Sequence, residues 1–288
     1  MARRIAAWLL ALLLLPTAVQ AEIFLAQPPA EWKAGDVLVW TIFDVNEGDA
    51  MLLSCGGENM LVDGGPEPAR EDLRRALEAR GLKNGLKYIL NTHHHEDHIT
   101  GIEHLFENGF TADIFLHPYD QKTLQTNKRL ARTAKAAKAS GARVRQVLGG
   151  DRFSVGGAEV ELYRCTEISG VNAQSLVAKV TFGSASILLC ADITGRTQRW
   201  FVENLPGDAL KADLIKLPHH AITPAVPAFL DQVNPKAAVV TNRVRELDSK
   251  SLTQLQGRGW PVFFSGDGTV YAVTDGTDWY LYQTPGAF

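Results

Sequence analysis

The sequence contains little cysteine. Its 288 residues include three cysteines, Cys55, Cys165 and Cys190, with no CxxC pair. This odd number leaves room for one disulfide, and a chain of this size does not depend on disulfides for its stability. Cys55 and Cys190 end apolar stretches, so we expect them to be buried packing residues. A thiol nucleophile is the alternative.

A strong excess of positive charge is also lacking. The chain has 29 Lys and Arg residues against 32 Asp and Glu residues, which gives a net charge of −3. As a whole it is therefore not the basic body expected of a dedicated nucleic-acid binder. The balance is uneven, however, because residues 121–150 hold eight basic residues and no acidic one.

The apolar run at residues 5–15 is too short to span a membrane, since it has 11 residues and a transmembrane helix needs about 20. Two arginines precede this run, Pro16 ends it, and Val19 and Ala21 are small residues placed for signal-peptide cleavage. We therefore expect residues 1–21 to be a secretory signal peptide. The mature protein would be periplasmic or secreted, without a stable membrane anchor. An uncleaved anchor is the alternative.

Segments rich in Pro, Gly and Ser that would mark a linker between domains are absent. Strand-like apolar stretches alternate with amphipathic helical stretches in both halves of the chain, and each half begins with strands. Residues 22–288 are thus expected to form one α/β hydrolase domain, a four-layer αββα sandwich of two mixed β-sheets with helices outside. The expected helices are residues 66–80, 99–107, 121–139, 196–203, 225–232 and 249–256.

The most informative motif is THHHEDH at residues 92–98, where a strand ends and a helix begins. It supplies three imidazoles and one carboxylate, which suit zinc or a similar transition metal: His93, His95, His98 and Asp97. Alternate side chains of an extended segment point to one face, so His93 and His95 can bind one ion while His94 points away. A solvated histidine-rich loop is the alternative.

The spacing HxHxDH resembles the signature of the metallo-β-lactamase fold superfamily. Five further segments resemble motifs of one branch, in the expected order: FDVNEGDA (43–50), LVDGG (61–65), NAQSLV (172–177), ILLCADI (187–193) and ADLIKLPHH (212–220). This branch is the extracytoplasmic hydrolase domain of ComEC-type DNA-uptake competence proteins. The resemblance covers nearly all of the expected mature chain, and it is specific to the fold and the branch rather than to the substrate.

The resemblance implies a two-metal centre. His93 and His95 would bind metal one, and Asp97 and His98 would bind metal two. Asp192 would bridge both ions; taken alone, it could instead cap the following helix. The implied cofactor is Zn²⁺, one or two ions, with Mn²⁺ as the alternative.

The pair at residues 219–220 would complete metal two. We favour His220 as this ligand and His219 as a group that faces the substrate, although the sequence leaves their order open and a polar loop is the alternative. Asp63, at a strand end, would accept a hydrogen bond from the ligand region and hold it in place.

The sequence also departs from the family pattern. Many members supply a third histidine to metal one where this chain has Asn172, so metal one would have a poorer ligand shell. His117 could fill this gap, or it is a polar residue at a strand end. The glycine of the branch's HHG motif is Ala221 here, and a glycine of its first motif is Asn46, a residue that tolerates a left-handed backbone.

The implied chemistry is hydrolysis by a metal-bound hydroxide, with Asp97 orienting the nucleophile and His219 as a second catalytic group. No GxSxG motif is present, and no Ser or Cys nucleophile is required. Our leading hypothesis is a phosphodiesterase or nuclease activity. The alternatives are hydrolysis of a small ester, lactone, β-lactam or phosphocholine-type substrate, and a non-catalytic metal-binding module of the same fold.

The basic segment at residues 121–150 bears on the substrate. It starts about twenty residues after the metal motif, so it could form a wall for the backbone of a nucleic acid or another phosphodiester. A solvated outer helix with Leu130, Ala134 and Ala137 toward the core is the alternative. Tyr119 is the one aromatic residue close to this segment, so stacking of single-stranded bases is not expected.

Overall fold

The computed structural model describes residues 21–33 and 35–285. Apart from Ala21, the expected signal peptide lies outside these residues. No helix in the described ranges is long and apolar enough to cross a membrane.

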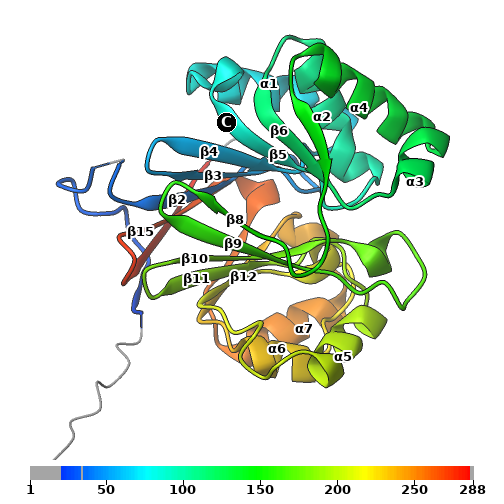
Figure 1. Cartoon of the computed structure of the whole chain (residues 1–288). Coiled ribbons are helices and arrows are strands. Elements are labelled where there is room, and N and C mark those ends of the chain that lie inside the picture. Colours follow the sequence, from blue (N-terminus) through cyan, green and yellow to red (C-terminus); the bar gives the residue numbers. More distant parts are fainter. Residues whose placement is uncertain (1–20, 34, 286–288) are drawn as a thin grey trace, which may run out of the picture.

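Two mixed β-sheets lie at the centre of the molecule (Figure 1). The first contains β1 (Ile23–Phe24), β2 (Leu38–Ile42), β3 (Met51–Cys55), β4 (Glu58–Val62), β5 (Leu86–Leu90), β6 (Ala112–His117), β7 (Arg143–Gln146), β15 (Thr269–Thr274) and β16 (Trp279–Thr284). The second contains β8 (Arg152–Val155), β9 (Ala158–Tyr163), β10 (Val177–Phe182), β11 (Ala185–Leu189), β12 (Leu214–Lys216), β13 (Ala237–Val240) and β14 (Val262–Phe264). The strand orders are β1-β16-β15-β2-β3-β4-β5-β6-β7 and β14-β13-β12-β11-β10-β9-β8.

Helices cover the outer face of each sheet (Figure 1). On the first sheet lie α1 (Arg70–Ala79), α2 (Glu96–Glu107) and α4 (Lys128–Ala139), with the short α3 (Gln121–Thr126) beside them. On the second lie α5 (Gly195–Asn204), α6 (Pro227–Val233) and α7 (Ser249–Arg258). Short 3-10 helices are η1 (Glu67–Ala69), η2 (Leu82–Asn84), η3 (Asn172–Gln174), η4 (Pro218–Ala221), η5 (Val244–Glu246) and η6 (Ser265–Asp267). The predicted αββα sandwich is confirmed.

The alternation of side chains along the strands builds the layers. In β11, Ile187 and Leu189 point inward and pack with Trp40 of the first sheet in the central core. Leu188 and Cys190 point outward and pack in the core beneath the helices of the second sheet. Successive side chains of a strand face opposite sides, so a strand between two layers is apolar throughout.

The three cysteines are packing residues, as expected for Cys55 and Cys190. All three are buried and free. Burial in these apolar surroundings raises the pKa of the Cys190 thiol. A thiol held protonated in this way is a poor nucleophile.

The prediction of a single helix at residues 121–139 is wrong. The structure breaks it at Asn127, where the backbone is extended and the side chain accepts hydrogen bonds from the N–H groups of Arg129 and Leu130. Asparagine competes with the helical backbone in this way and begins a new helix instead of continuing the old one. Leu130, Ala134 and Ala137 of the resulting α4 are buried, as expected for a core-facing side.

In both sheets, parallel strands have their carboxyl ends at the same edge of the sandwich. In the first sheet β4 and β5 run parallel, and in the second β11, β12 and β13 do so. Loops that follow parallel neighbours emerge at the same edge, where ligands of α/β proteins commonly bind. Every motif in the sequence that carries a candidate metal ligand follows one of these strands.

Two glycines allow α2 to approach the loop after β4. A Cβ atom on Gly101 would lie 1.8 Å from the carbonyl oxygen of Gly64. The close contact between residues 64 and 101 therefore fixes α2 against the sheet. It also fixes the ligand loop, the name used here for residues 92–98, which lead from β5 into the first turn of α2.

We expect Gly101→Ala to lower the free energy of unfolding by roughly 1–3 kcal/mol, because overpacking outweighs the better helix propensity of alanine. The matched control is Gly257→Ala in α7, where a Cβ atom meets nothing within 4 Å. That change should raise the free energy of unfolding by about 0.4–1 kcal/mol. Urea unfolding measures the free energy of unfolding of both variants. Equal changes of the same sign would contradict a close contact at Gly101 that tolerates no Cβ atom.

Candidate metal centre

Four donor side chains from the first turn of α2, the loop after β11 and η4 meet at this edge and lie within 4.8 Å of one another: Asp97, His98, Asp192 and His220. His220 Nε2 lies 3.1 Å from Asp97 Oδ2 and 3.3 Å from Asp192 Oδ1. His98 Nε2 lies 3.3 Å from the same Asp192 oxygen. Ligands of a tetrahedral ion with bonds of about 2.0–2.1 Å stand about 3.3 Å apart, so this spacing fits one metal ion.

Hydrogen bonds behind the rings leave both Nε2 atoms free. His98 Nδ1 lies 2.8 Å from Asp63 Oδ2, and a carboxylate can only accept. Thr241 donates its one hydroxyl proton to Asp49 Oδ1 at 2.7 Å, so it accepts from His220 Nδ1 at 2.9 Å. Both rings are thus protonated at Nδ1 when neutral.

The two Nε2 lone pairs therefore face each other across 3.3 Å, between His98 and His220. Asp192 Oδ1, which lies between them and is buried, has no hydrogen-bond partner among the described residues. When both rings are neutral, two lone pairs and a carboxylate oxygen converge here. These side chains fit a bound cation.

In the metal-free protein, protons take the cation's place. Burial alone would lower the pKa of His98, but the neighbouring carboxylates of Asp192 and Asp63 outweigh burial and raise it to about 10. The pKa of His220 is raised well above its ordinary value for the same reason, with Asp192 as the main partner. A metal ion that binds here must displace these protons.

A second group of donors, His93, His95 and Asp192, lies beside the first. His93 Nε2 is buried, has no hydrogen-bond partner in the described part of the chain, and lies 3.7 Å from Asp192 Oδ2. Thr92 donates to Asp63 at 2.6 Å, so its hydroxyl accepts from His93 Nδ1 at 3.2 Å and leaves Nε2 free. Asp192 thus offers one oxygen to each group, as a bridging ligand would.

Asp63 holds the ligand loop, in the role expected for it. It follows β4 with a left-handed φ of 56° and is fully buried. Its carboxylate accepts hydrogen bonds from the backbone N–H of Thr92 at 2.8 Å and from Asn91 Nδ2 at 3.0 Å, besides those from Thr92 Oγ1 and His98. These bonds fix the turn that carries residues 92–98.

Sequence reasoning missed the buried ion pair behind the centre. Lys216 Nζ lies 2.7 Å from Asp49 Oδ2, donates to the carbonyl oxygen of Ala191 at 2.9 Å, and lies 3.7 Å from Asp192 Oδ1. Burial alone would raise the pKa of Asp49, but the Lys216 ammonium, together with His220 and His98, outweighs burial and lowers this pKa. A lysine inside an apolar strand of the sequence was the available signal, because lysine is almost never fully buried without a partner.

The structure separates the members of the pair at residues 219–220. His220 is buried and joins the cluster with Asp97 and His98. The side chain of His219 is 29% exposed; its Nε2 lies 3.2 Å from Asn172 Nδ2 and 3.8 Å from Asp192 Oδ2. His219 and Asn172 therefore stand at the side of the His93 group, where the family's third histidine is missing.

The structure argues against two alternatives that the sequence left open, Asp192 as a helix cap and His117 as a metal ligand. The cap of α5 is Thr194, whose hydroxyl accepts from Thr197 N–H, so Asp192 is free of this role. His117 belongs to no metal cluster of the described residues. Its Nδ1 accepts from Tyr119 N–H at 3.2 Å, and burial together with the charge of Lys138 lowers its pKa to about 4.

The turn that carries His219 and His220 is strained. Residues 219, 220 and 221 have φ values of 50°, 50° and 54°, a left-handed region that costs about 1–2 kcal/mol for each non-glycine residue. Ala221 thus adopts the conformation that a glycine supplies in the family motif, and Asn46 does the same with φ 66°. Such strain persists only where surrounding contacts impose it, as at ligand sites.

The basic segment at residues 121–150 has fewer cations available to bind a ligand than its eight basic residues suggest. Arg129 pairs with Glu96 at 2.5 Å and Arg132 pairs with Glu103 at 2.6 Å. Both acidic partners belong to α2, on which α4 packs. At least two of the eight cations therefore stabilise the outer helical layer.

We expect Thr241→Val to weaken metal binding by about 10- to 100-fold, because the isosteric side chain removes the acceptor that fixes the His220 tautomer. Competition with a chromogenic chelator measures the affinity. Thr253→Val, on the exposed face of α7, is the matched control and should bind metal as the unchanged protein does. Unchanged affinity in Thr241→Val would contradict the assigned hydrogen-bond chain.

Stability and metal affinity should depend on pH in opposite directions. The folded pKa of His98, about 10, exceeds its ordinary value of 6.5, so its stabilising contribution is complete below pH 6.5 and is lost as the pH rises toward 10. Metal-free protein should therefore lose stability on this alkaline side. Zinc affinity should rise about tenfold per pH unit for each displaced proton. Denaturation and calorimetry measure the two trends; a pH-independent affinity between about pH 6 and 8 would contradict them.

Comparisons with known proteins identify the family and the fold. Residues 44–240 match the Metallo-beta-lactamase superfamily. The structure is similar to YhfI, a metallo-beta-lactamase fold protein from Bacillus subtilis, with a TM-score of 0.53 and 12% identity over 78% of this chain and 96% of that chain. It is also similar to CmlA beta-hydroxylase, with a TM-score of 0.51 and 15% identity over 83% of this chain and 53% of that chain. No curated protein sequence matches. Since the family match spans more than half of the sequence, the chain belongs to the metallo-beta-lactamase superfamily.

Proposed function

We propose that this protein is an exported metal-dependent phosphodiesterase that acts on nucleic acid or another phosphodiester. The observation that carries the proposal is the convergence of two groups of donors on Asp192, where the buried atoms His93 Nε2 and Asp192 Oδ1 have no hydrogen-bond partner among the described residues. The assignment to a ComEC-like branch rests on the six sequence motifs, and the proposed export rests on residues 1–21 alone.

A cavity of about 390 Å³ gives access to the His93 group. His95, Asn172, Thr194 and the exposed Arg196 line it. A guanidinium group matches the geometry and charge of a phosphate, and here it stands at the N-terminal turn of α5. Arg196, rather than the basic segment of α4, is the cation that supports a phosphodiester substrate at this cavity.

When bound, two metal ions would supply Lewis acidity toward the phosphate and activate a water molecule. Asp97 is the most exposed member of its group, with a side chain 30% exposed. Burial would raise its pKa, but the hydrogen bond from His220 and the charge of His98 outweigh burial and lower it to about 2. That value belongs to the metal-free protein, in which His98 and His220 are protonated. As an ionised carboxylate, Asp97 would accept a hydrogen bond from the attacking water and orient it.

His219 would contact the substrate. Burial lowers its pKa below the ordinary value, with the charge of Asp192 acting in the opposite sense, so the ring is neutral at pH 7. A neutral, partly exposed imidazole beside Asp192 can hydrogen-bond an oxygen of the substrate. Asn172 holds this ring at 3.2 Å.

A hydrolase of a small ester or lactone is the second candidate. The volume of the access cavity, about 390 Å³, falls in the range of small-molecule sites, and Ile168, Val171 and Ala173 give it apolar walls. The same metal centre would serve this reaction, so the substrate panel below separates the two candidates.

Zinc- or manganese-loaded protein should cleave bis(p-nitrophenyl) phosphate and oligonucleotides. Asp97→Asn should lower the rate by at least about 100-fold, because it removes both a metal ligand and the group that orients the water. Asp113→Asn, exposed on β6, is the matched control and should keep the full rate.

Three results would contradict the proposal. Phosphodiester cleavage no faster than in Asp97→Asn would reject a phosphodiesterase. Hydrolysis of p-nitrophenyl esters, lactones or a chromogenic cephalosporin in its place would favour the second candidate. Less than one bound ion per chain under zinc-replete conditions would favour a non-catalytic module.

A further inference from the structure

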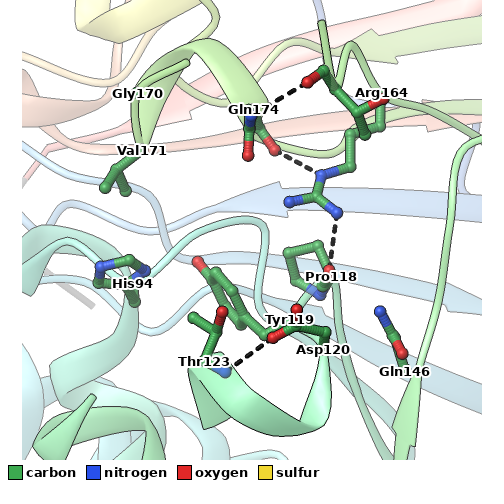
Figure 2. A pocket seen from close by; sticks show the side chains of 11 residues that line it. His94, Pro118, Tyr119, Asp120, Thr123, Gln146, Arg164, Gly170, Val171 and Gln174 are labelled. Carbon is green, nitrogen blue, oxygen red and sulfur yellow. Dashed lines mark hydrogen bonds between the residues drawn. The ribbon is translucent and has the colours of Figure 1, made fainter. Parts of the chain in front are cut away.

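A second cavity lies on the other side of the ligand loop. Its volume is about 420 Å³, with His94 and Tyr119 on one side and Arg164 and Gln174 on the other (Figure 2). It shares residues 170–171 with the cavity that contains His95. His94 points away from the candidate ligands His93 and His95, so this cavity lies on the opposite side of the segment that carries them and meets the first cavity at residues 170–171.

Arg164 is half-buried at this cavity without an acidic partner. Its Nε donates to the carbonyl oxygen of Gln174 at 2.8 Å, and its Nη1 donates to that of Pro118 at 2.7 Å. No described residue forms an ion pair with it or accepts a hydrogen bond from Nη2. Figure 2 shows this free end of the guanidinium turned toward Tyr119 and His94.

The positive charge of Arg164 persists despite burial. Burial lowers its pKa, but a guanidinium group stays protonated in proteins. Asp120 also lines the cavity, but its exposed carboxylate accepts from Thr123 N–H at 2.7 Å and caps α3 instead of pairing with Arg164. The charge of Asp120 still acts on Arg164 from a distance, but the direct contacts of the guanidinium are two carbonyl groups, which leaves room for an anionic ligand at Nη2.

Neutral polar groups complete the lining. Gln146, Thr123, Thr166 and Gln174 border the cavity, and all of them can donate hydrogen bonds. The lining thus combines one fixed guanidinium with neutral donors, and its one carboxylate, Asp120, is exposed and turned to the start of α3. Such a lining can hold a single tetrahedral or planar anion at the Arg164 side.

We propose that this cavity is a subsite for a second phosphate group of the substrate, whose scissile phosphate lies at the metal centre. This inference rests on the proposed phosphodiesterase function and narrows it. The substrate class would be an extended phosphodiester with at least two phosphates, such as an oligonucleotide, rather than a single head group.

Arg164 could serve only to tie the Pro118 loop to η3, and a structural role of this kind predicts a different result. It depends on the two hydrogen bonds to carbonyl oxygens and not on the substrate. A subsite depends on the positive charge and acts only on substrates that carry the second phosphate.

The experiment compares a thymidine dinucleotide with the same dinucleotide phosphorylated at its 5′ or 3′ end. The ratio of the two kcat/KM values, phosphorylated over unphosphorylated, should fall by about 10- to 100-fold in Arg164→Gln. Arg164→Lys, which keeps the charge, should retain the ratio within about threefold. Arg152→Gln removes an equal charge at an exposed position paired with Glu161 and should leave the ratio unchanged.

Binding separates this inference from the proposed function. Anisotropy of a labelled oligothymidylate is measured with zinc-loaded Asp97→Asn, with and without Arg164→Gln, at fixed salt. Binding that requires Arg164, in a protein that cleaves no phosphodiester, would reject the function but keep the subsite. An unchanged ratio in Arg164→Gln, or an equal loss of the ratio in Arg164→Lys and Arg164→Gln, would overturn the subsite even if cleavage is observed.

Discussion

The metal centre depends on one constraint: each imidazole must present the lone pair of Nε2 to the same small volume. Buried carboxylates impose this by fixing the Nδ1 protons. Asp63 does so for His98 directly and for His93 through the Thr92 hydroxyl. A hydroxyl that donates its one proton to a carboxylate can only accept from the imidazole ring. The ring nitrogen that faces the hydroxyl must therefore carry the proton, and this determines the tautomer of the ring.

The same constraint explains the buried ion pair. Asp49 must stay ionised to accept from Thr241, and an isolated buried carboxylate would take up a proton instead. Lys216 prevents this at 2.7 Å, and its bond to the carbonyl oxygen of Ala191 also holds the turn before Asp192. Through Asp49 and Thr241 one lysine thereby supports the His220 ring, and through Ala191 it holds the turn before Asp192, which couples the two segments that carry these donors.

Much of this arrangement follows from local patterns in the sequence. Strand periodicity and the order of motifs predicted the αββα layers, and the extended run at residues 92–95 predicted that His94 would point away from its neighbours. The helix break at Asn127 was missed because side-chain capping competes with helix propensity, and the two effects differ by about 1 kcal/mol or less. The roles of Thr92 and Thr241 were missed because a threonine after a strand is common and gains meaning only from the groups that it contacts.

By itself, the sequence determined the fold class and the chemical kinds of donor, because both are encoded in periodicity and residue type. The family resemblance grouped the donors in advance, but only the tertiary structure brings them together, since Asp97, Asp192 and His220 are far apart in the chain and meet where parallel strands of two sheets end. It also distinguished His220 from His219, which differ by one residue and point to different surroundings. Arg164 is ordinary in the sequence; its lack of an acidic partner is visible only once the loops around it are folded.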